Sequence, residues 1–251
     1  MKVYKYHSCE NVFLIVEYKN DIDFKNVSKK LCNELQADGL LVFKNDPMEM
    51  LVFNKDGSRA GMCGNGIRCL THYIYNKYGI YKYMEIISNN YKYDCQIINT
   101  NPFTSSVSLG IGDYYGDVIK KEININEKTF IVSAFILGVG HVVVMSDDFN
   151  EDIKYIKKIF EHELFDKNFN VNLVKVIDNK TFEFITYERG VEFTKSCGTG
   201  AAVCAYILHT EYMLDNNLVA LCPGGVLRVD IDDVITLRGE SIFINEYEIN
   251  I

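Results

Sequence analysis

The sequence predicts an α/β (α+β) fold of two pseudo-symmetric domains, each a sheet wrapped around a central helix. The motif Cys-Gly-x-Gly occurs twice, at Cys63–Gly66 and at Cys197–Gly200. Each copy follows an apolar strand-like segment and runs directly into an apolar helical segment. Because the segments before each copy also follow one order, we interpret the chain as an internal duplication.

In the first half, apolar residues at helical spacing predict a helix, which is followed by a loop and a strand at Leu40–Phe43. The apolar segment Met50–Phe53 predicts a second strand that leads into the first Cys-Gly turn. The helix after this turn is expected to end near Gly79. The positions that define the two helices are Phe24, Val27, Leu31 and Leu35 in the earlier one and Ile67, Leu70 and Ile74 in the later one.

The second half repeats this order. A helix precedes a strand at Val171–Val176, and a strand at Phe182–Tyr187 leads into the second Cys-Gly turn. The helix after that turn is expected to end near 215–217. The helical positions are Ile153, Ile156, Ile159, Phe160 and Leu164 before the strands and Val203, Ile207, Leu208 and Leu214 after the turn.

The boundary between the halves has no Pro- or Ser-rich linker. The best candidate is Gly110–Tyr114, which places the domains at 1–114 and 115–240. Both helices that follow the Cys-Gly turns are apolar on most faces. We therefore expect each of them to be buried by the strands of its own half.

Composition favours a soluble, cytoplasmic enzyme that acts on a small molecule. The formal net charge of −8 over 251 residues argues against a nucleic-acid surface. No apolar run approaches the roughly 18 residues of a spanning helix, and Met1–Tyr4 shows no secretory leader. The 8 cysteines include no Cys-x-x-Cys pair and no Cys/His cluster at zinc spacing, so neither a disulfide scaffold nor a metal site is expected.

The Cys-Gly turns predict carbon-acid chemistry. Glycine lets a tight turn direct backbone N–H groups at an anion, and a helix N-terminus lowers the pKa of a nearby thiol from about 8.5. With Cys63 and Cys197 on opposite faces of an α-carbon, one removes a proton and the other returns it, which inverts the centre. Backbone N–H groups stabilise the developing charge in place of pyridoxal phosphate, so no cofactor is expected. The expected carboxylate-binding residues are Gly64, Asn65, Gly198 and Thr199.

A lone cysteine is usually a small buried hydrophobe. The repetition of the motif favours catalysis for Cys63 and Cys197. The remaining six cysteines lack that context and are expected to be packing residues: Cys9, Cys32, Cys69, Cys95, Cys204 and Cys222.

Two long segments resemble the active-site segments of diaminopimelate epimerases: Asn54–Cys69 and Tyr187–Ala201. Shorter similarities lie at His7–Phe13, Ala37–Leu40, Gly138–His141, Asn170–Asn172 and Pro223–Gly225. The resemblance implies that the chain is a cofactor-independent racemase or epimerase whose active site lies in a cleft between two similar domains. It also implies that the final strand, Ile242–Ile249, returns to the first domain.

By the same resemblance, a second group of side chains reads the distal end of the substrate: Asn11, Asn54, Asn170, Glu188 and Arg189. Arg189 is suited to a bidentate pair with a distal carboxylate, and Glu188 to a distal ammonium. The alternative is that these two are an exposed pair of adjacent charges, which contribute little.

The chain departs from the family pattern around this pocket. Val139 stands where the family has an amide, and Glu192–Thr194 replaces the usual Gly-Glu-Thr. Loss of a hydrogen-bonding group weakens selection for a second zwitterionic end. We therefore favour a substrate other than diaminopimelate, with histidine as the candidate, and keep diaminopimelate as the alternative.

Three questions stay open at this point. His141 fits either a structural imidazole or a proton shuttle, and we exclude it from the catalytic pair. A degenerate amino-acid-binding protein is the non-enzymatic alternative, although carboxylate binding needs no thiol. A redox sensor that links Cys63 to Cys197 is a further alternative. The expected partner is a small amino acid, with no nucleic acid and no membrane, and a homodimer is compatible with the sequence.

Overall fold

The computed structural model describes residues 1–79, 82–109, 118–165, 169–188 and 191–250. The chain divides into two compact units, one made of Met1–Ser108 with Arg238–Ile251 and the other of Leu109–Leu237. The expected boundary segment, Gly110–Tyr114, lies outside the described residues. Each unit is mixed α/β, with strands in the majority and two described helices, as the sequence predicts.

The first unit begins with a hairpin and carries one short outer helix and one long inner helix. Its strands are β1 (Lys2–Ser8), β2 (Asn11–Glu17), β3 (Gly39–Lys44), β4 (Glu49–Asn54), β5 (Arg59–Ala60), β6 (Tyr83–Ser88), β7 (Tyr91–Thr100), β8 (Phe103–Ser108) and β18 (Ile242–Glu248). Its helices are α1 (Phe24–Glu34) and α2 (Gly64–Tyr78). The strand β17 (Ile235–Glu240) belongs to this unit from Arg238 onward.

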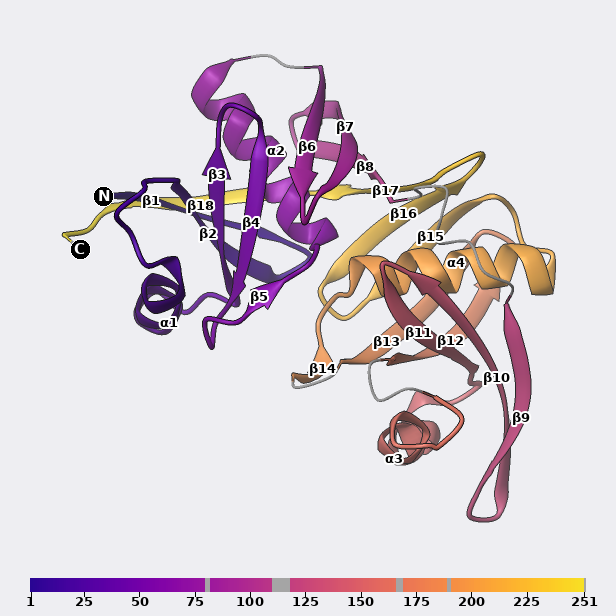
Figure 1. Ribbon diagram of the computed structural model, residues 1–251. Coiled ribbons are helices and arrows are strands. Elements are labelled where there is room, and N and C mark those ends of the chain that lie inside the picture. Colours follow the sequence, from indigo (N-terminus) through magenta and orange to yellow (C-terminus); the bar gives the residue numbers. More distant parts are fainter. Residues whose placement is uncertain (80–81, 110–117, 166–168, 189–190, 251) are drawn as a thin grey trace. The chain divides into compact units, whose positions relative to one another are not determined.

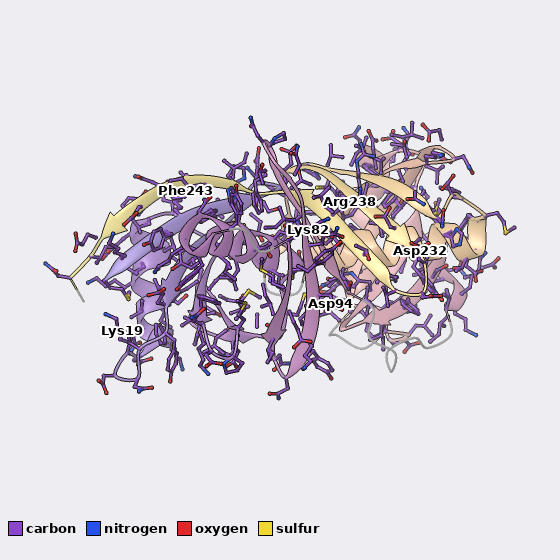
Figure 2. The ribbon with its side chains drawn as sticks, turned by 90° about the horizontal axis from the view of Figure 1, so that it is seen from above. Lys19, Lys82, Asp94, Asp232, Arg238 and Phe243 are labelled. Carbon is purple, nitrogen blue, oxygen red and sulfur yellow. The ribbon has the colours of Figure 1, made fainter. Side chains whose placement is uncertain are left out.

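The strand pairing brings the starts of β2 and β3 and the end of β4 to the same end of the first sheet. β2 runs parallel to β3 with Phe13 beside Gly39, and β4 runs antiparallel to β3 with Asn54 beside Gly39. β18 pairs antiparallel with β1, so the two chain ends meet in Figure 1. Phe243 of β18, labelled in Figure 2, packs on Tyr6 with ring centroids 5.1 Å apart.

The helix α2 is the central helix of this unit. Ile67, Leu70 and Ile74 are fully buried, and the helix contacts strands on several sides, among them β1, β2 and β8. It ends at Gly79, whose φ of +98° favours glycine. The outer helix α1 begins at Asp23, whose side chain accepts hydrogen bonds from the N–H groups of Lys25 and Asn26.

The second unit repeats this arrangement. Its strands are β9 (Ile119–Ile125), β10 (Lys128–Leu137), β11 (Val139–Met145), β12 (Asn170–Asp178), β13 (Thr181–Glu188), β14 (Glu192–Thr194), β15 (Asn217–Cys222), β16 (Gly225–Ile231) and the start of β17. Its helices are α3 (Phe149–Phe160) and α4 (Gly198–Tyr212). In Figure 1, α4 and α3 lie on opposite sides of β11, β12 and β13.

The register of the strands shows which positions of the two units correspond. β11 runs parallel to β12 with His141 beside Asn170, and β12 runs antiparallel to β13 with Asn172 beside Thr186. In the first unit β2, β3 and β4 pair in the same senses, with Phe13 beside Gly39 and Leu41 beside Val52. Counting from these pairs, Phe13, Leu41 and Val52 hold the places that His141, Asn172 and Thr186 hold in the second unit.

The fold prediction is confirmed, with differences at the ends of three helices. The helix α1 ends at Glu34 and α3 ends at Phe160, so Leu35 and Leu164, which were predicted as helical positions, lie beyond them. The third difference is the end of α4. That helix ends at Tyr212 because Met213 adopts a left-handed conformation, and the Leu214 N–H then bonds to the Leu208 carbonyl. Leu214 therefore lies beyond the helix. Among the described residues, no helix has the length and apolarity needed to cross a bilayer.

Candidate functional site

Cys63 lies at the N-cap of α2, with extended backbone angles and its sulfur turned back over the first turn. The Gly66 N–H donates to the sulfur at 3.4 Å. An N-cap side chain normally satisfies one of the unpaired N–H groups that open a helix, and here sulfur takes that position. An added Cβ at Gly66 would lie 3.1 Å from Leu41 Cδ2 and 3.5 Å from the sulfur.

Cys197 repeats this geometry at the N-cap of α4. The Gly200 N–H donates to its sulfur at 3.4 Å. The N–H groups of Gly66 and Gly200 are therefore directed at sulfur, where they favour thiolate. The predicted carboxylate ligands Gly64, Asn65, Gly198 and Thr199 occupy the first turn after each cysteine.

A buried arginine supports the first turn. Arg68 is fully buried on α2 and donates to the Gly64 carbonyl at 3.2 Å, to Ser8 Oγ at 2.8 Å and to Asn65 Oδ1 at 2.5 Å. These bonds compensate for burying a cation. They also fix Gly64 and Asn65, the two residues that follow Cys63.

The predicted asparagines of the first unit lie at the ends of neighbouring strands. Asn11 begins β2 and donates to Asp38 Oδ2 at 3.1 Å, just before β3. Asn54 ends β4, is exposed, and donates to Ser58 Oγ at 2.9 Å. The structure thus places both residues at the edge where Gly39 begins β3.

In the second unit Glu188 lies at the end of β13, beside Cys197. Its Oε1 accepts from Thr194 Oγ1 at 2.7 Å, and its carboxylate also accepts from the Cys197 thiol. Burial raises the pKa of Glu188 above its usual value, against the lowering effect of these two donors. Burial, followed by the Glu188 charge, raises the pKa of Cys197 well above its usual value, while Thr199 and the Gly200 N–H lower it.

The other predicted residues of this unit differ in burial, and one of them is not described. Asn170 is buried at the start of β12, beside His141 on β11. Arg189 lies outside the described residues. Val139 and Phe193, the residues behind the expected change of pocket, are 39% and 47% exposed.

His141 belongs to a buried polar chain that the sequence did not reveal. Its Nε2 lies 3.0 Å from Thr199 Oγ1, and its Nδ1 lies 3.1 Å from Asn172 Nδ2. Thr186 Oγ1 donates to Asn172 Oδ1 at 2.8 Å. The one signal available from the sequence is that Asn172 and Thr186 are polar at inward-facing positions of apolar strands.

Four of the other cysteines are packing residues. Cys32, Cys69, Cys95 and Cys204 are buried, and burial raises the pKa of each of these thiols. His72 is similarly structural, since its ring stacks on Phe103 at 3.9 Å and its Nδ1 lies 3.2 Å from Ser241 Oγ.

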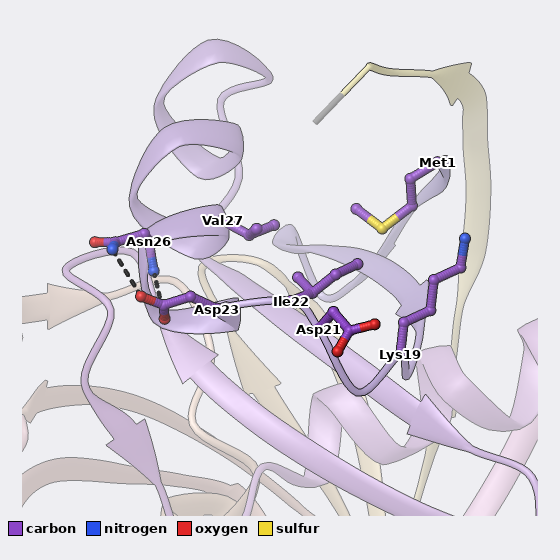
Figure 3. A pocket seen from close by; sticks show the side chains of 7 residues that line it. All are labelled: Met1, Lys19, Asp21, Ile22, Asp23, Asn26 and Val27. Atoms are coloured by element: carbon purple, nitrogen blue, oxygen red, sulfur yellow. Dashed lines mark hydrogen bonds between the residues drawn. The ribbon is translucent and has the colours of Figure 1, made fainter.

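A separate hollow of about 440 Å³ lies at the start of α1 (Figure 3). It is lined by Met1, Lys19, Asp21, Ile22, Asp23, Asn26 and Val27, none of which belongs to the predicted site. Within the described ranges, no three His, Cys, Asp or Glu side chains are grouped so as to hold a metal ion.

Comparison with solved structures supports the fold. A hydroxyproline epimerase from Agrobacterium vitis superposes with a TM-score of 0.75, covering 98% of this chain and 91% of that one at 9% identity. A PhzC/PhzF-type phenazine biosynthesis protein from Clostridium difficile superposes with a TM-score of 0.73 over 100% of both chains at 13% identity. At these identities the likeness is one of fold alone.

Comparison with known sequences identifies the family. The diaminopimelate epimerase of Clostridium perfringens is 32% identical over 97% of both chains, and that of Caldanaerobacter subterraneus is 30% identical over 99% of this chain and 100% of its own. The sequence model of the family "Diaminopimelate epimerase" matches residues 3–85 and 133–243. The chain belongs to the diaminopimelate epimerase family and is an isomerase.

Proposed function

We propose that this enzyme interconverts LL- and meso-diaminopimelate by inverting one α-carbon without pyridoxal phosphate. Cys63 and Cys197 act on the same α-carbon, one as thiolate base and the other as thiol acid. The base takes the α-proton to become a thiol, and the acid gives its proton to the opposite face to become a thiolate. The protein therefore returns with the roles of the two sulfurs exchanged.

The observation that carries the proposal is the repeated position of the sulfurs. Each half of the duplication presents a cysteine at the N-cap of its central helix, with one N–H donated to sulfur at 3.4 Å. A packing cysteine needs no such position, and a carboxylate-binding turn needs no sulfur. The repeated geometry thus supports two thiols in equivalent chemical roles.

The surroundings of Cys197 support its alternation between acid and base. The Glu188 carboxylate favours the thiol, whereas Thr199 and the Gly200 N–H favour the thiolate. Neither protonation state of Cys197 is favoured by all of its neighbours. Such a balance suits a sulfur that gives up its proton in one direction of the reaction and takes it in the other.

The comparisons favour diaminopimelate over histidine as substrate. The relatives similar over nearly the whole chain are diaminopimelate epimerases. The expectation of histidine rested on Val139 and on the altered segment Glu192–Thr194, and nothing in the comparisons supports it. We therefore propose the diamino acid, read at its distal end by Asn11, Asn54, Asn170, Glu188 and Arg189.

The test is a chiral-chromatography assay of LL- and meso-diaminopimelate, meso-lanthionine and L-histidine. We expect LL-diaminopimelate to have the highest kcat/KM and Val139→Asn to raise it no more than severalfold. Cys63→Ser and Cys197→Ser should each lower turnover by orders of magnitude, because hydroxyls are far weaker acids than thiols. Cys222→Ser, a change of the same kind outside both turns, is the matched control.

Two outcomes would contradict the proposal. A higher kcat/KM for histidine than for LL-diaminopimelate would return the substrate to the one favoured by the pocket departures. Binding of these amino acids without any isomer formation would make the chain a binding protein.

A further inference from the structure

A continuous chain of hydrogen bonds runs beneath the second Cys-Gly turn. It passes from Thr186 on β13 to Asn172 on β12, then to His141 on β11, to Thr199 on α4 and to Cys197. The successive distances are 2.8, 3.1, 3.0 and 3.5 Å. Asn172 and His141 are fully buried and Thr186 nearly so, which makes their partners obligatory.

The amide of Asn172 fixes the direction of this chain. Its Nδ2 lies 3.1 Å from the Val142 carbonyl, which can only accept, so this atom is the NH2 group and Oδ1 faces Thr186. The second hydrogen of Nδ2 then points at His141 Nδ1. That ring nitrogen must accept, so the proton of a neutral His141 is on Nε2.

The tautomer determines what Thr199 does. His141 Nε2–H donates to Thr199 Oγ1, so the threonine hydroxyl has its own hydrogen left to donate to Cys197 Sγ. We propose that Asn172 and His141 are positioning residues that hold the Thr199 hydroxyl as a donor to Cys197 and so favour its thiolate. This inference rests on the proposed function, in which Cys197 alternates between thiol and thiolate.

The first unit shows that the fold does not require this chain. The equivalent positions there are Phe13, Leu41 and Val52, which are apolar and buried. Leu41 and Asn172 occupy equivalent places in their own units. A Cβ added at Gly66 would lie 3.1 Å from Leu41 Cδ2, and a Cβ added at Gly200 would lie 2.7 Å from Asn172 Oδ1. Burying polar groups where an apolar set suffices is costly, so a specific role explains them better than packing.

The electrostatics of the second unit agree with a neutral donor. Burial lowers the pKa of His141 to about 3, so its ring carries no charge near neutral pH. Within the described part of the chain, the titratable side chains that face Cys197 are Glu188 directly and His141 through Thr199. Glu188 opposes the thiolate, which leaves Thr199 and the Gly200 N–H as the groups that favour it.

The first test reads the tautomer directly, without an activity assay. Long-range 1H–15N correlation spectra of the histidine-labelled full chain, assigned with His141→Gln, should show His141 protonated on Nε2 alone between pH 5 and 8. A ring protonated on Nδ1, or on both nitrogens, would overturn the proposal. This result does not depend on the substrate, so it is separable from failure of the proposed function.

The second test follows the Cys197 thiol by the pH dependence of its 13Cβ resonance. Thr199→Val should raise the titration midpoint by about one pH unit, the size expected for loss of a hydrogen bond to a charged group. Thr199→Ser, which keeps the hydroxyl, should stay near the wild type. Asn172→Ala should raise the midpoint in the same direction, and the double variant Asn172→Ala/Thr199→Val should add nothing further.

Thr186→Val is the matched control for loss of a buried hydrogen bond. It removes the donor to Asn172 Oδ1 but leaves both Nδ2 bonds, so the His141 tautomer and the Cys197 midpoint should not change. An unchanged midpoint in Thr199→Val would overturn the proposal, as would additive shifts in the double variant. If Asn172→Ala does not fold, the wild-type tautomer and the two Thr199 variants still decide the question.

Discussion

Replacing Glu188 with glutamine is expected to lower the pKa of Cys197 and to slow epimerisation at the same time. The carboxylate accepts a hydrogen bond from the thiol, and its charge is the largest influence on the sulfur after burial. Glutamine keeps the shape and removes the charge. It can also donate to a thiolate, which acts in the same direction.

The size of the change is estimated from Coulomb's law for two neighbouring unit charges. Unit charges about 4 Å apart interact by roughly 1 kcal/mol in water and about 4 kcal/mol at an effective dielectric constant of 20. Since one pKa unit corresponds to about 1.4 kcal/mol, the Cys197 pKa should fall by roughly one to three units. Glu188 ionises before Cys197 as pH rises, so its charge is present while the thiol titrates.

The 13Cβ titration of Cys197 measures this shift, and a diaminopimelate assay on the same samples measures the loss of turnover. Glu192→Gln is the matched control, because Glu192 lies opposite Glu188 on β14 and is exposed. Its Cys197 midpoint should equal that of the wild type. An unchanged or higher midpoint in Glu188→Gln would refute the electrostatic reasoning for this site.

Two further predictions concern stability and packing. Gly200→Ala should lower the unfolding midpoint and the activity more than Gly66→Ala, because the new Cβ meets the hydrogen-bonded Asn172 Oδ1 at 2.7 Å in one case and the terminal methyl carbon Leu41 Cδ2 at 3.1 Å in the other. Equal effects in chemical denaturation would contradict this. Burial lowers the pKa of His72 to about 4, below its unfolded value of 6.5, so the unfolded chain binds more protons and stability is lost as pH falls through this window. His72→Gln should reduce that loss, and an unchanged pH dependence of the unfolding midpoint would show that His72 does not contribute.

The two central helices and their cysteine caps could be predicted because their signals are local. Apolar spacing defines α2 and α4, and a glycine pair after each cysteine marks the turn. The predicted end of α4 lies too far along the chain because Leu214 continues the apolar spacing. In the structure the left-handed backbone of Met213 ends the helix. A left-handed residue at a helix end is usually glycine, so the methionine at this position gives no signal in the sequence.

The polar chain under Cys197 could not be predicted because its partners come from four separate elements. Asn172, Thr186 and His141 meet only through the register of β11, β12 and β13. Arg68 was likewise hidden, since a charged residue on a helix normally indicates an exposed face. Its burial depends on acceptors supplied by Ser8, 60 residues away in the sequence, and by the turn it supports.

The most direct test of the two-cysteine account is isotope exchange in deuterium oxide. LL-diaminopimelate should give meso product that carries one deuterium at the inverted carbon, while unreacted LL-substrate recovered early in the reaction keeps its protium. This pattern requires one group to remove the proton and a different, solvent-exchanged group to supply the new one. Deuterium in the recovered substrate at the same rate as in the product, or retention of protium in the product, would indicate a single base and contradict the account.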